Sequence, residues 1–257
     1  MSVRLSTLPD VMRPGVGVVM ASTWRVSMPE RQRAAVEAIT RAWRSRPWPE
    51  NGPLAYSVLT GDDGDALFHY SQWRDQAAYR AFVAQGRDER VAEIDAAVPG
   101  IERVGLSQYI LYRATGPTAE AAGAAPAEAP VPGCFVTVDV EFEAPGPEGA
   151  GPADAAAPAR PRGWVDTVLE ALATDPALPP GGLNAYFHVS LDGTRVLNLA
   201  AWESARAHAD ALARPGQGIG SDTAQWQAVR DYPGLKGSVV TRWTPAITLS
   251  PEGDAAA

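Results

Sequence analysis

The sequence predicts an α+β fold made of two copies of a β-α-β-β-α-β unit in one chain. The length of 257 residues suits two small domains, and an apolar content of 46% is enough to build a core for each. Two blocks, 15–113 and 131–249, repeat one order of strand-like and helix-like segments. Between them, residues 114–130 are almost wholly Ala, Pro, Gly, Thr and Glu, which is typical of a flexible linker.

The first block contains six segments with distinct patterns. β-branched and alternating residues predict a strand over 16–26. A helix follows, with Ser27 as its expected N-cap and Pro29 in its first turn. Residues 54–73 alternate on both sides of an Asp/Gly turn, which predicts a hairpin. We then expect a helix over 74–85 with Asp75 near its start, a short extra helix over 86–97 and a strand over 100–113.

The second block repeats these segments closely enough to be aligned. Trp73 falls on Trp202, and Pro99-Gly100 falls on Pro233-Gly234. Tyr56 aligns with Tyr186 if the alignment is shifted by one residue at the Asp-Gly turn. The predicted domains are therefore copy one at 1–113, the linker at 114–130, copy two at 131–249 with a flexible insertion at 144–162, and a disordered tail at 250–257.

The order of elements is that of the ferredoxin-like split β-α-β-β-α-β fold. Both helices of such a unit cover one face of a four-stranded sheet, and the other face needs a partner. Two copies in one chain can cover each other. We therefore expect the two sheets to pair into a dimeric α+β barrel within the chain.

Composition and missing motifs narrow the function classes. The net charge of −8 argues against nucleic acid as a partner. No apolar run approaches the roughly 20 residues of a membrane span, and no secretion signal is recognisable, so we expect a cytoplasmic protein without membrane contact. The single Cys134 excludes an internal disulfide. There is no P-loop, GxGxxG, CxxC or HExxH motif, and three His with one Cys are too few for a zinc site, so no cofactor or metal is expected.

The hairpin "AYSVLTGDDGDALFHYSQW", with its strand ending in Trp and a helix following, resembles the antibiotic biosynthesis monooxygenase family of dimeric α+β barrels. The resemblance covers both blocks. It implies a cofactor-independent oxygenase that converts an anthrone-type aromatic polyketide to a quinone with O₂. Val83 and Leu212 stand where the haem-degrading branch has its iron-binding His, so the resemblance does not extend to haem.

The resemblance also implies site residues. The family has an Asn four residues before the strand-end Trp, a Tyr six residues after it, and a His on the preceding strand. Neither copy has the complete set. Copy two has Asn198, Trp202, His208 in the Tyr place, and His188; copy one has His69 in the Asn place, Trp73 and Tyr79.

Residue chemistry fits this assignment. Asn198 and Trp202 are four apart on a strand, so they share one sheet face and can donate hydrogen bonds to a phenolate. His188 or His208 can accept the proton. We therefore predict copy two as the catalytic half. Copy one is expected to hold an altered substrate-binding pocket around His69, Trp73 and Tyr79, and Tyr56 and Tyr186 are further expected binding residues.

Other interpretations stay open at this point. The strand-end Trp residues and Tyr79 can be ordinary core residues, and His208 a solvated helix residue. Asn198 and His69 can each lie on the solvent face of the sheet or be buried polar groups that need partners. A non-catalytic small-molecule-binding protein, or a polyketide cyclase or isomerase, would use the same pocket. The expected partners are an aromatic substrate and O₂, and the chain can also form a homodimer.

Overall fold

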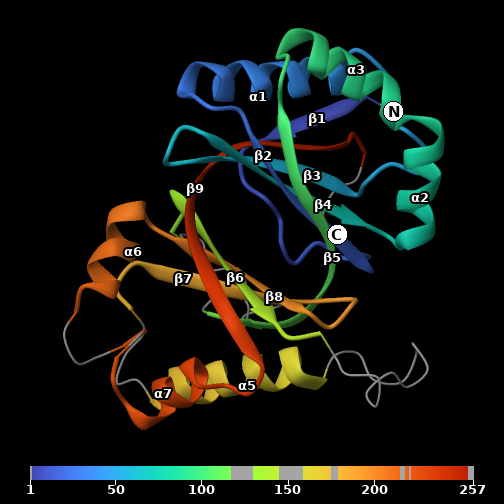
Figure 1. Ribbon diagram of the computed structural model, residues 1–257. Coiled ribbons are helices and arrows are strands. Elements are labelled where there is room, and N and C mark those ends of the chain that lie inside the picture. The colour runs from blue at the N-terminus through green and yellow to red at the C-terminus, as the bar shows by residue number, and fades with distance from the viewer. Residues whose placement is uncertain are drawn as a thin grey trace. The chain divides into compact units, whose positions relative to one another are not determined.

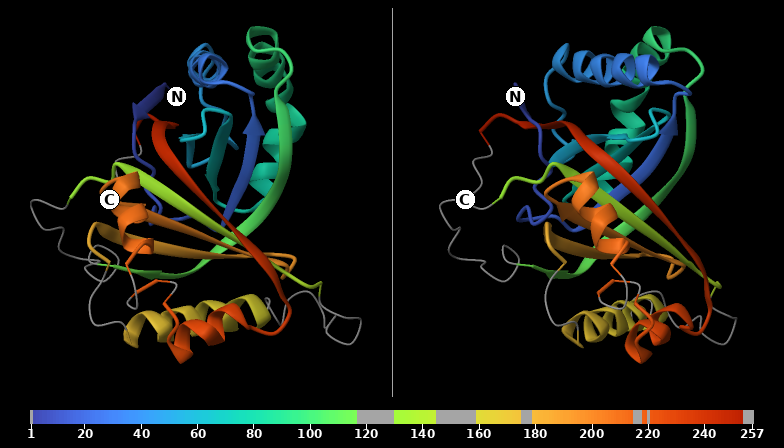
Figure 2. Two further views of the ribbon diagram at one scale, coloured as in Figure 1. Left: turned by 60° about the vertical axis from the view of Figure 1, so that its left-hand side comes forward. Right: turned by 90° about the vertical axis from the view of Figure 1, so that its left-hand side faces the viewer.

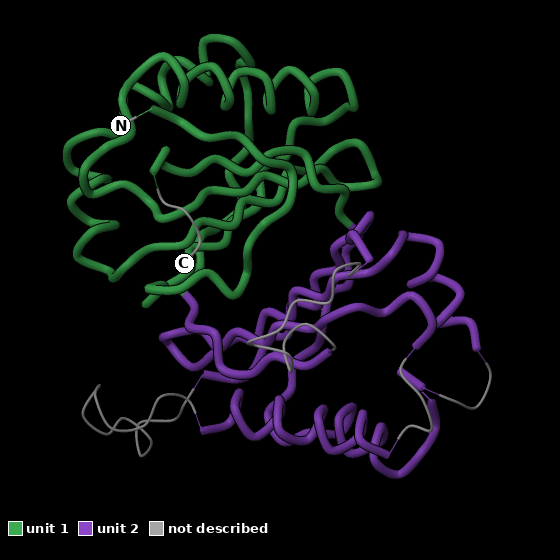
Figure 3. Tube along the Cα trace, turned by 180° about the vertical axis from the view of Figure 1, so that it is seen from behind, with its two compact units in different colours: residues 1–108, 243–257 green, residues 109–242 purple. Residues whose placement is uncertain are grey.

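The computed structural model describes residues 2–116, 130–144, 159–174, 179–214, 218–219 and 221–253. These residues form nine strands and six helices (Figure 1). The chain divides into two compact units: unit 1 comprises 1–108 and 243–257, and unit 2 comprises 109–242 (Figure 3). Within the described residues, no helix combines the length and the apolar character needed to cross a membrane.

Unit 1 is an antiparallel sheet with its helices on one face (Figure 2). The strand order is β1-β9-β3-β4-β2-β5. The strands are β1 (Val3–Ser6), β2 (Val18–Arg25), β3 (Ala55–Gly61), β4 (Ala66–Trp73), and parts of β5 (Glu102–Thr115) and β9 (Leu235–Pro251). The helices are α1 (Pro29–Arg44), α2 (Gln76–Gln85) and α3 (Arg87–Ala97).

The start of α1 differs from the sequence prediction. The expected N-cap Ser27 lies one residue too early: Met28 is the N-cap, and Ser27 has a left-handed backbone with φ of 77°. The Ser27 amide donates to Asp65 Oδ1 at 2.7 Å. The side chain of Asp65, from the hairpin turn, therefore binds the backbone where a capping side chain was expected. Pro29 occupies the first turn as predicted, where its missing N–H costs no helix hydrogen bond.

The predicted hairpin and second helix are confirmed. Asp63 Oδ1 accepts from the amides of Asp65 and Ala66, and Gly64 provides a positive φ of 74° for the turn. Asp75 caps α2 by accepting from the Ala78 amide at 2.8 Å. The expected extra helix is α3.

Unit 2 has the strand order β5-β7-β8-β6-β9. Its further strands are β6 (Cys134–Phe142), β7 (Gly182–Ser190) and β8 (Arg195–Trp202), and its helices are α5 (Ala159–Thr174), α6 (Ala205–Leu212) and α7 (Ala224–Arg230). Helices α5 and α7 lie side by side along one face of its sheet (Figures 1 and 2). Ser204 caps α6 as Asp75 caps α2.

A glycine stands in the same place at the start of the first long strand in each unit. The Gly17 amide donates to the carbonyl of Trp73, and the Gly133 amide donates to that of Trp202. A Cβ on Gly17 would come to 2.2 Å from the Arg74 carbonyl oxygen, and one on Gly133 to 2.5 Å from that of Glu203. Only glycine allows this close approach at the strand-to-helix corner.

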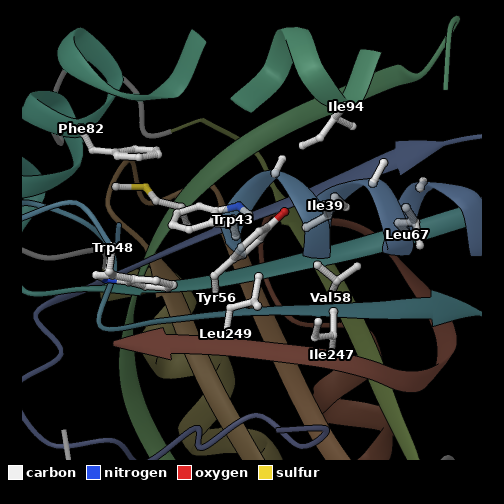
Figure 4. Packing of buried hydrophobic residues seen from close by; sticks show 14 of the residues in the cluster. Ile39, Trp43, Trp48, Tyr56, Val58, Leu67, Phe82, Ile94, Ile247 and Leu249 are labelled. Atoms are coloured by element: carbon white, nitrogen blue, oxygen red, sulfur yellow. The ribbon is translucent and has the colours of Figure 1, made fainter. Parts of the chain in front are cut away.

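The core of unit 1 lies between the sheet and α1, α2 and α3. Figure 4 shows Trp43 of α1 beside Tyr56 of β3 and Phe82 of α2, with ring centroids 5.4 and 5.7 Å from that of Trp43. Ile247 and Leu249 of β9 extend this core. In unit 2, α5 and α7 bury Trp164 and Trp226 against the sheet.

The predicted boundaries of the tail and of the insertion agree with the structure only in part. Ser250 and Pro251, placed in the expected tail, lie in β9 and pair with Arg4 and Val3, respectively, of the unexpected strand β1. Residues 159–162 of the expected insertion belong to α5. Residues 117–129 of the linker, 145–158 of the insertion and 254–257 of the tail lie outside the described residues. The copy boundaries and the pairing of the two sheets into one barrel stay predictions.

Candidate functional site

Each unit contains a cavity between the helix-covered face of its sheet and its helices. The unit 1 cavity has a volume of about 190 Å³ and the unit 2 cavity about 270 Å³. Both include the Trp that ends the second hairpin strand, which is Trp73 in β4 and Trp202 in β8. The equivalent elements therefore form a cavity in each unit.

The unit 1 cavity brings together all four residues that the sequence suggested for copy one. Tyr56, His69, Trp73 and Tyr79 line it. Tyr56 comes from β3, His69 and Trp73 from β4, and Tyr79 from α2. The alternation of side chains along β4 places His69 and Trp73 on the helix-covered face.

His69 has one engaged and one unengaged ring nitrogen. Its Nδ1 is hydrogen-bonded to the Tyr56 hydroxyl at 2.7 Å. Its Nε2 is buried and has no hydrogen-bond partner among the described residues. The Trp24 ring packs on the imidazole with a centroid separation of 4.0 Å. A buried polar atom without a partner is costly, so this nitrogen is a candidate to meet a ligand.

Burial keeps both members of this pair uncharged. Burial, with a smaller contribution from the positive charge of Arg103, lowers the pKa of the His69 imidazole to about 3. Burial also raises the pKa of the Tyr56 hydroxyl, against a smaller opposite effect of Arg103. At neutral pH the pair is a neutral imidazole beside a protonated phenol.

Trp73 and Tyr79 form the wall at the other end of β4. Their rings meet edge to face with centroids 5.2 Å apart. The Trp73 indole donates to Ser71 Oγ at 2.9 Å, so its N–H is already engaged. Burial raises the pKa of the Tyr79 hydroxyl, partly offset by the charge of Arg87.

Four residues of this cavity were not predicted from the sequence. Trp24 of β2, Arg87 and Arg90 of α3 and Arg103 of β5 also line it. The sequence could have indicated two of them. Arg87 and Arg90 have the helical spacing that places them on the same face of α3 as Ile94, which is a core residue. Nothing local in the sequence marked Trp24 or Arg103.

The unit 2 cavity contains two of the four residues predicted as catalytic. Asn198 and Trp202 line it, together with the rings of Trp164, Trp226 and Phe187. Asn198 Oδ1 is buried and lacks a hydrogen-bond partner in the described part of the chain. Asn198 stands four residues before its Trp, as His69 does, so each cavity has an unengaged polar atom at the same place.

His188 and Tyr186 do not line the unit 2 cavity. Phe187 pairs with Asn198 across β7 and β8, so the residues on either side of Phe187 point to the opposite face. His188 is fully buried there, and its Nδ1 lies 3.1 Å from the Tyr186 carbonyl oxygen and 3.2 Å from that of Leu197. Burial lowers the pKa of His188 to about 4.

The strand register also changes the alignment of Tyr56. Tyr56 pairs with Ser71, two residues before Trp73. Two residues before Trp202 is Ala200, whose partner is Ala185. Tyr56 therefore corresponds to Ala185, and the one-residue slip that matched it with Tyr186 was wrong.

His208 lies beside the unit 2 cavity without lining it. Its ring meets Trp202 edge to face at 4.9 Å, repeating the contact between Tyr79 and Trp73. The side chain is buried, and Nδ1 accepts a hydrogen bond from Arg242 Nε at 2.9 Å. Burial, followed by the charge of Arg242, lowers the pKa of His208 to about 4. His208 is thus a buried residue rather than a solvated one.

Comparison with known proteins shows the fold. No protein-family model matches the sequence, and no curated protein matches it. Among solved structures, the chain resembles an anthrone oxidase-like protein, with 14% identity, a TM-score of 0.64 and 99% of each chain covered. It also resembles a candidate monooxygenase from Fusobacterium nucleatum, with 10% identity, a TM-score of 0.52, and 94% of this chain and 97% of that chain covered.

A third solved structure is a monooxygenase from the gene ActVA-Orf6 of Streptomyces coelicolor, in complex with nanaomycin D. It is 26% identical, covers 45% of this chain and 88% of that chain, and has a TM-score of 0.31. The first two likenesses, at their low identity, establish that this chain shares its α+β fold with those proteins.

Within the described residues, no three His, Cys, Asp or Glu side chains come together as a metal site would require. The expectation of chemistry without a cofactor stays a prediction.

Proposed function

We propose that this protein is a cofactor-independent monooxygenase that oxidises an anthrone- or phenol-type aromatic molecule with O₂. The observation that carries the proposal is His69, with Nδ1 bonded to Tyr56 and Nε2 buried without a partner in an aromatic cavity. The fold shared with an anthrone oxidase-like protein is consistent with it.

We propose unit 1 as the reacting half, in contrast to the sequence prediction. Among the described residues that line the unit 2 cavity there is no histidine to accept a proton, because neither His188 nor His208 is one of them. The unit 1 cavity has His69 as an acceptor and Arg103 nearby as a cation. Asn198 and Trp202 then belong to a second, binding cavity.

The proposed reaction converts a ring methylene to a carbonyl: R₂CH₂ + O₂ gives R₂C=O + H₂O. A role as proton acceptor requires the His69 tautomer with its proton on Nδ1, donated to the Tyr56 oxygen, so that Nε2 can take a proton from the substrate. The resulting substrate anion gives electrons to O₂, and a peroxide anion forms at the same carbon. It takes back the proton from His69 to become a hydroperoxide, and loss of water, with the second hydrogen of that carbon, leaves the carbonyl.

The charges of the site support this role for His69. An imidazolium is disfavoured at this buried position, as the low pKa of His69 indicates. A substrate anion beside it changes that balance, because opposite charges attract strongly where water is excluded. Arg103, which also donates to Asp95, adds a positive charge near the anion.

The test is oxygen uptake by metal-free protein with an anthrone as substrate. His69→Gln is expected to lower the rate about 100-fold or more, as for loss of a general base. Asn198→Ala and Trp202→Ala are expected to leave most of the rate. If these two variants abolish uptake and His69→Gln does not, the reaction occurs in unit 2, as the sequence suggested. No uptake above background in wild-type protein would refute the oxygenase.

A second candidate is a non-catalytic small-molecule-binding protein, favoured by the unit 2 cavity with its apolar walls and one unengaged amide. A ligand that raises the melting temperature and is recovered unchanged would support it. A cyclase or isomerase using His69 as base would give a product without added oxygen, which product mass distinguishes.

We also propose that the two units derive from one duplicated β-α-β-β-α-β element. The shared features are the corner glycines Gly17 and Gly133, the helix caps Asp75 and Ser204, and the edge-to-face ring beside each strand-end Trp. Cytoplasmic location and a homodimer of the chain stay predictions from the sequence.

A further inference from the structure

The unit 1 cavity is lined by arginine as well as by aromatic side chains. Its described lining residues include three arginines, Arg87, Arg90 and Arg103, and neither Asp nor Glu. Its walls are otherwise mostly aromatic or aliphatic side chains. A cavity of this kind favours a planar apolar molecule that also carries negative charge.

Two of the three guanidinium groups are already held by the protein. Arg90 is buried, donates to the carbonyl oxygens of Gly86 and Pro47, and lies 4.8 Å over the Trp43 ring. Arg103 donates to Asp95 at 2.6 Å and lies 4.7 Å over the Trp24 ring. The Nε atoms of Arg90 and Arg103 are both buried and have no hydrogen-bond partner among the described residues. Their orientation is therefore set before any ligand arrives.

Arg87 differs from these two arginines, because its guanidinium is not bound by another group of the protein among the described residues. No hydrogen bond or ion pair joins the half-buried Arg87 side chain to another described residue. Its neighbours Asp88 and Glu89 are exposed and do not line the cavity. Its donors remain available to a ligand.

Arg87 lies at the opposite end of the cavity from His69. His69 and Trp73 are four residues apart on β4, which separates them by about 13 Å. Arg103 binds Asp95, eight residues along α3 from Arg87, a distance of about 12 Å. Arg103 with Trp24 and His69 therefore marks one end, and Arg87 with Tyr79 and Trp73 marks the other.

We propose that the substrate is an aromatic carboxylic acid, and that Arg87 binds its carboxylate while the reacting carbon lies beside His69. This deepens the proposed oxygenase function and rests on it for the position of the reacting carbon. A guanidinium matches a planar carboxylate with two parallel hydrogen bonds, and the roughly 12 Å between the ends fits a molecule of several fused rings.

The unit 2 cavity provides a contrast within the same chain. Its one lining arginine, Arg230, donates to the Ser221 carbonyl and to Asp222 and Gln227. No comparable unengaged cation lines that cavity in the described residues. A preference for a carboxylate should therefore depend on unit 1 alone.

The test measures binding without turnover. Anthracene-2-carboxylate and anthracene-2-carboxamide, which differ in charge and little in shape, are titrated under anaerobic conditions and followed by quenching of tryptophan fluorescence. The wild-type protein is expected to bind the carboxylate about 10- to 100-fold more tightly, the range for a charge-assisted hydrogen bond. Arg87→Gln is expected to remove this preference with little effect on the carboxamide.

Two further variants control the experiment. Arg87→Lys keeps the charge without the two-pronged geometry and should retain part of the preference. Arg41→Gln makes the same charge change on the exposed side of α1, away from the cavity, and should behave as wild type. Equal affinities for the two probes in wild-type protein, or an equal loss of preference in Arg41→Gln and Arg87→Gln, would overturn the proposal.

The outcome is separable from that of the oxygenase proposal. A carboxylate preference that depends on Arg87 supports this inference even if no oxygen is consumed. Oxidation of neutral and acidic anthrones at the same kcat/KM, with no difference in Arg87→Gln, supports the oxygenase and overturns the carboxylate site.

Discussion

His69 is expected to make unit 1 sensitive to acid, and His69→Gln is expected to remove that sensitivity. The pKa of His69 falls from the ordinary 6.5 to about 3 mainly because its side chain is buried, with 4% exposed, and to a smaller extent because of the positive charge of Arg103. Between pH 3 and pH 6.5, the His69 ring binds a proton in the unfolded chain but not in the folded protein. The folded protein therefore bears no penalty from His69 above pH 6.5, and its free energy of unfolding decreases as the pH falls from 6.5 toward 3.

The size of the effect follows from that difference. One pKa unit corresponds to about 1.4 kcal/mol, so His69 costs the folded state roughly 2 kcal/mol at pH 5 and roughly 4 kcal/mol near pH 3. His188 and His208 add losses of their own in the wild-type protein, because their pKa values are about 4. His69→Gln should remove only the contribution of His69.

The assay is urea denaturation at pH 7, 6 and 5. Between pH 7 and pH 5, the free energy of unfolding of His69→Gln should fall by about 2 kcal/mol less than that of the wild type. Tyr56→Phe is the control, because it removes the hydrogen-bond partner and keeps the titrating ring. It should keep the wild-type dependence on pH. Nitrogen-15 spectra of labelled histidine should show His69 unchanged from pH 8 to 5.

Identical pH dependence in wild type and His69→Gln would refute this reasoning. So would a His69 signal that titrates near pH 6.5, because it would mean that water or another partner solvates Nε2. The proposed general base would then be an ordinary hydrated imidazole.

Three further predictions concern the elements that shape unit 1. Gly17→Ala should lower the free energy of unfolding by about 1–3 kcal/mol in chemical denaturation, because its Cβ would come to 2.2 Å from the Arg74 carbonyl oxygen; a midpoint equal to wild type would contradict the close approach. Gln32→Leu should cost about 2 kcal/mol, because the buried Gln32 amide donates at 3.0 and 2.8 Å to two carbonyls of the hairpin end; a neutral result would mean that those carbonyls have other partners. Asp75→Ala should cost about 1 kcal/mol and Asp75→Asn much less, since Asn also caps helices; equal losses would argue against the cap.

The two cavities show how one framework can hold different chemistry. The strand-end Trp and the residue four before it occupy the same place in both units, yet that residue is His69 in one and Asn198 in the other. The His can accept a proton and the Asn cannot. The proposed roles of the two units therefore differ because of one position on the second hairpin strand, which is His69 in unit 1 and Asn198 in unit 2.

Much of the fold could be predicted because its signals are local. The alternation along 54–73 and the Asp/Gly turn define the hairpin, and Asp75 starts the following helix. The same alternation correctly placed His69 with Trp73 and Asn198 with Trp202. Ser27 failed as an N-cap because Asp65, 38 residues away, binds its backbone amide.

The sequence by itself determined the order of elements, the strand-end Trp in each unit and the shared face of each Trp with the residue four before it, since these depend on periods of 2 and 3.6 residues along the chain. Only the tertiary structure decided which histidine lines a cavity. Strand register turns His188 away from Asn198, packing buries His69 Nε2 without a partner, and β5 and α3 bring Arg103 and Arg87 to the two ends of the cavity. These outcomes depend on pairings between distant segments, which local patterns do not specify.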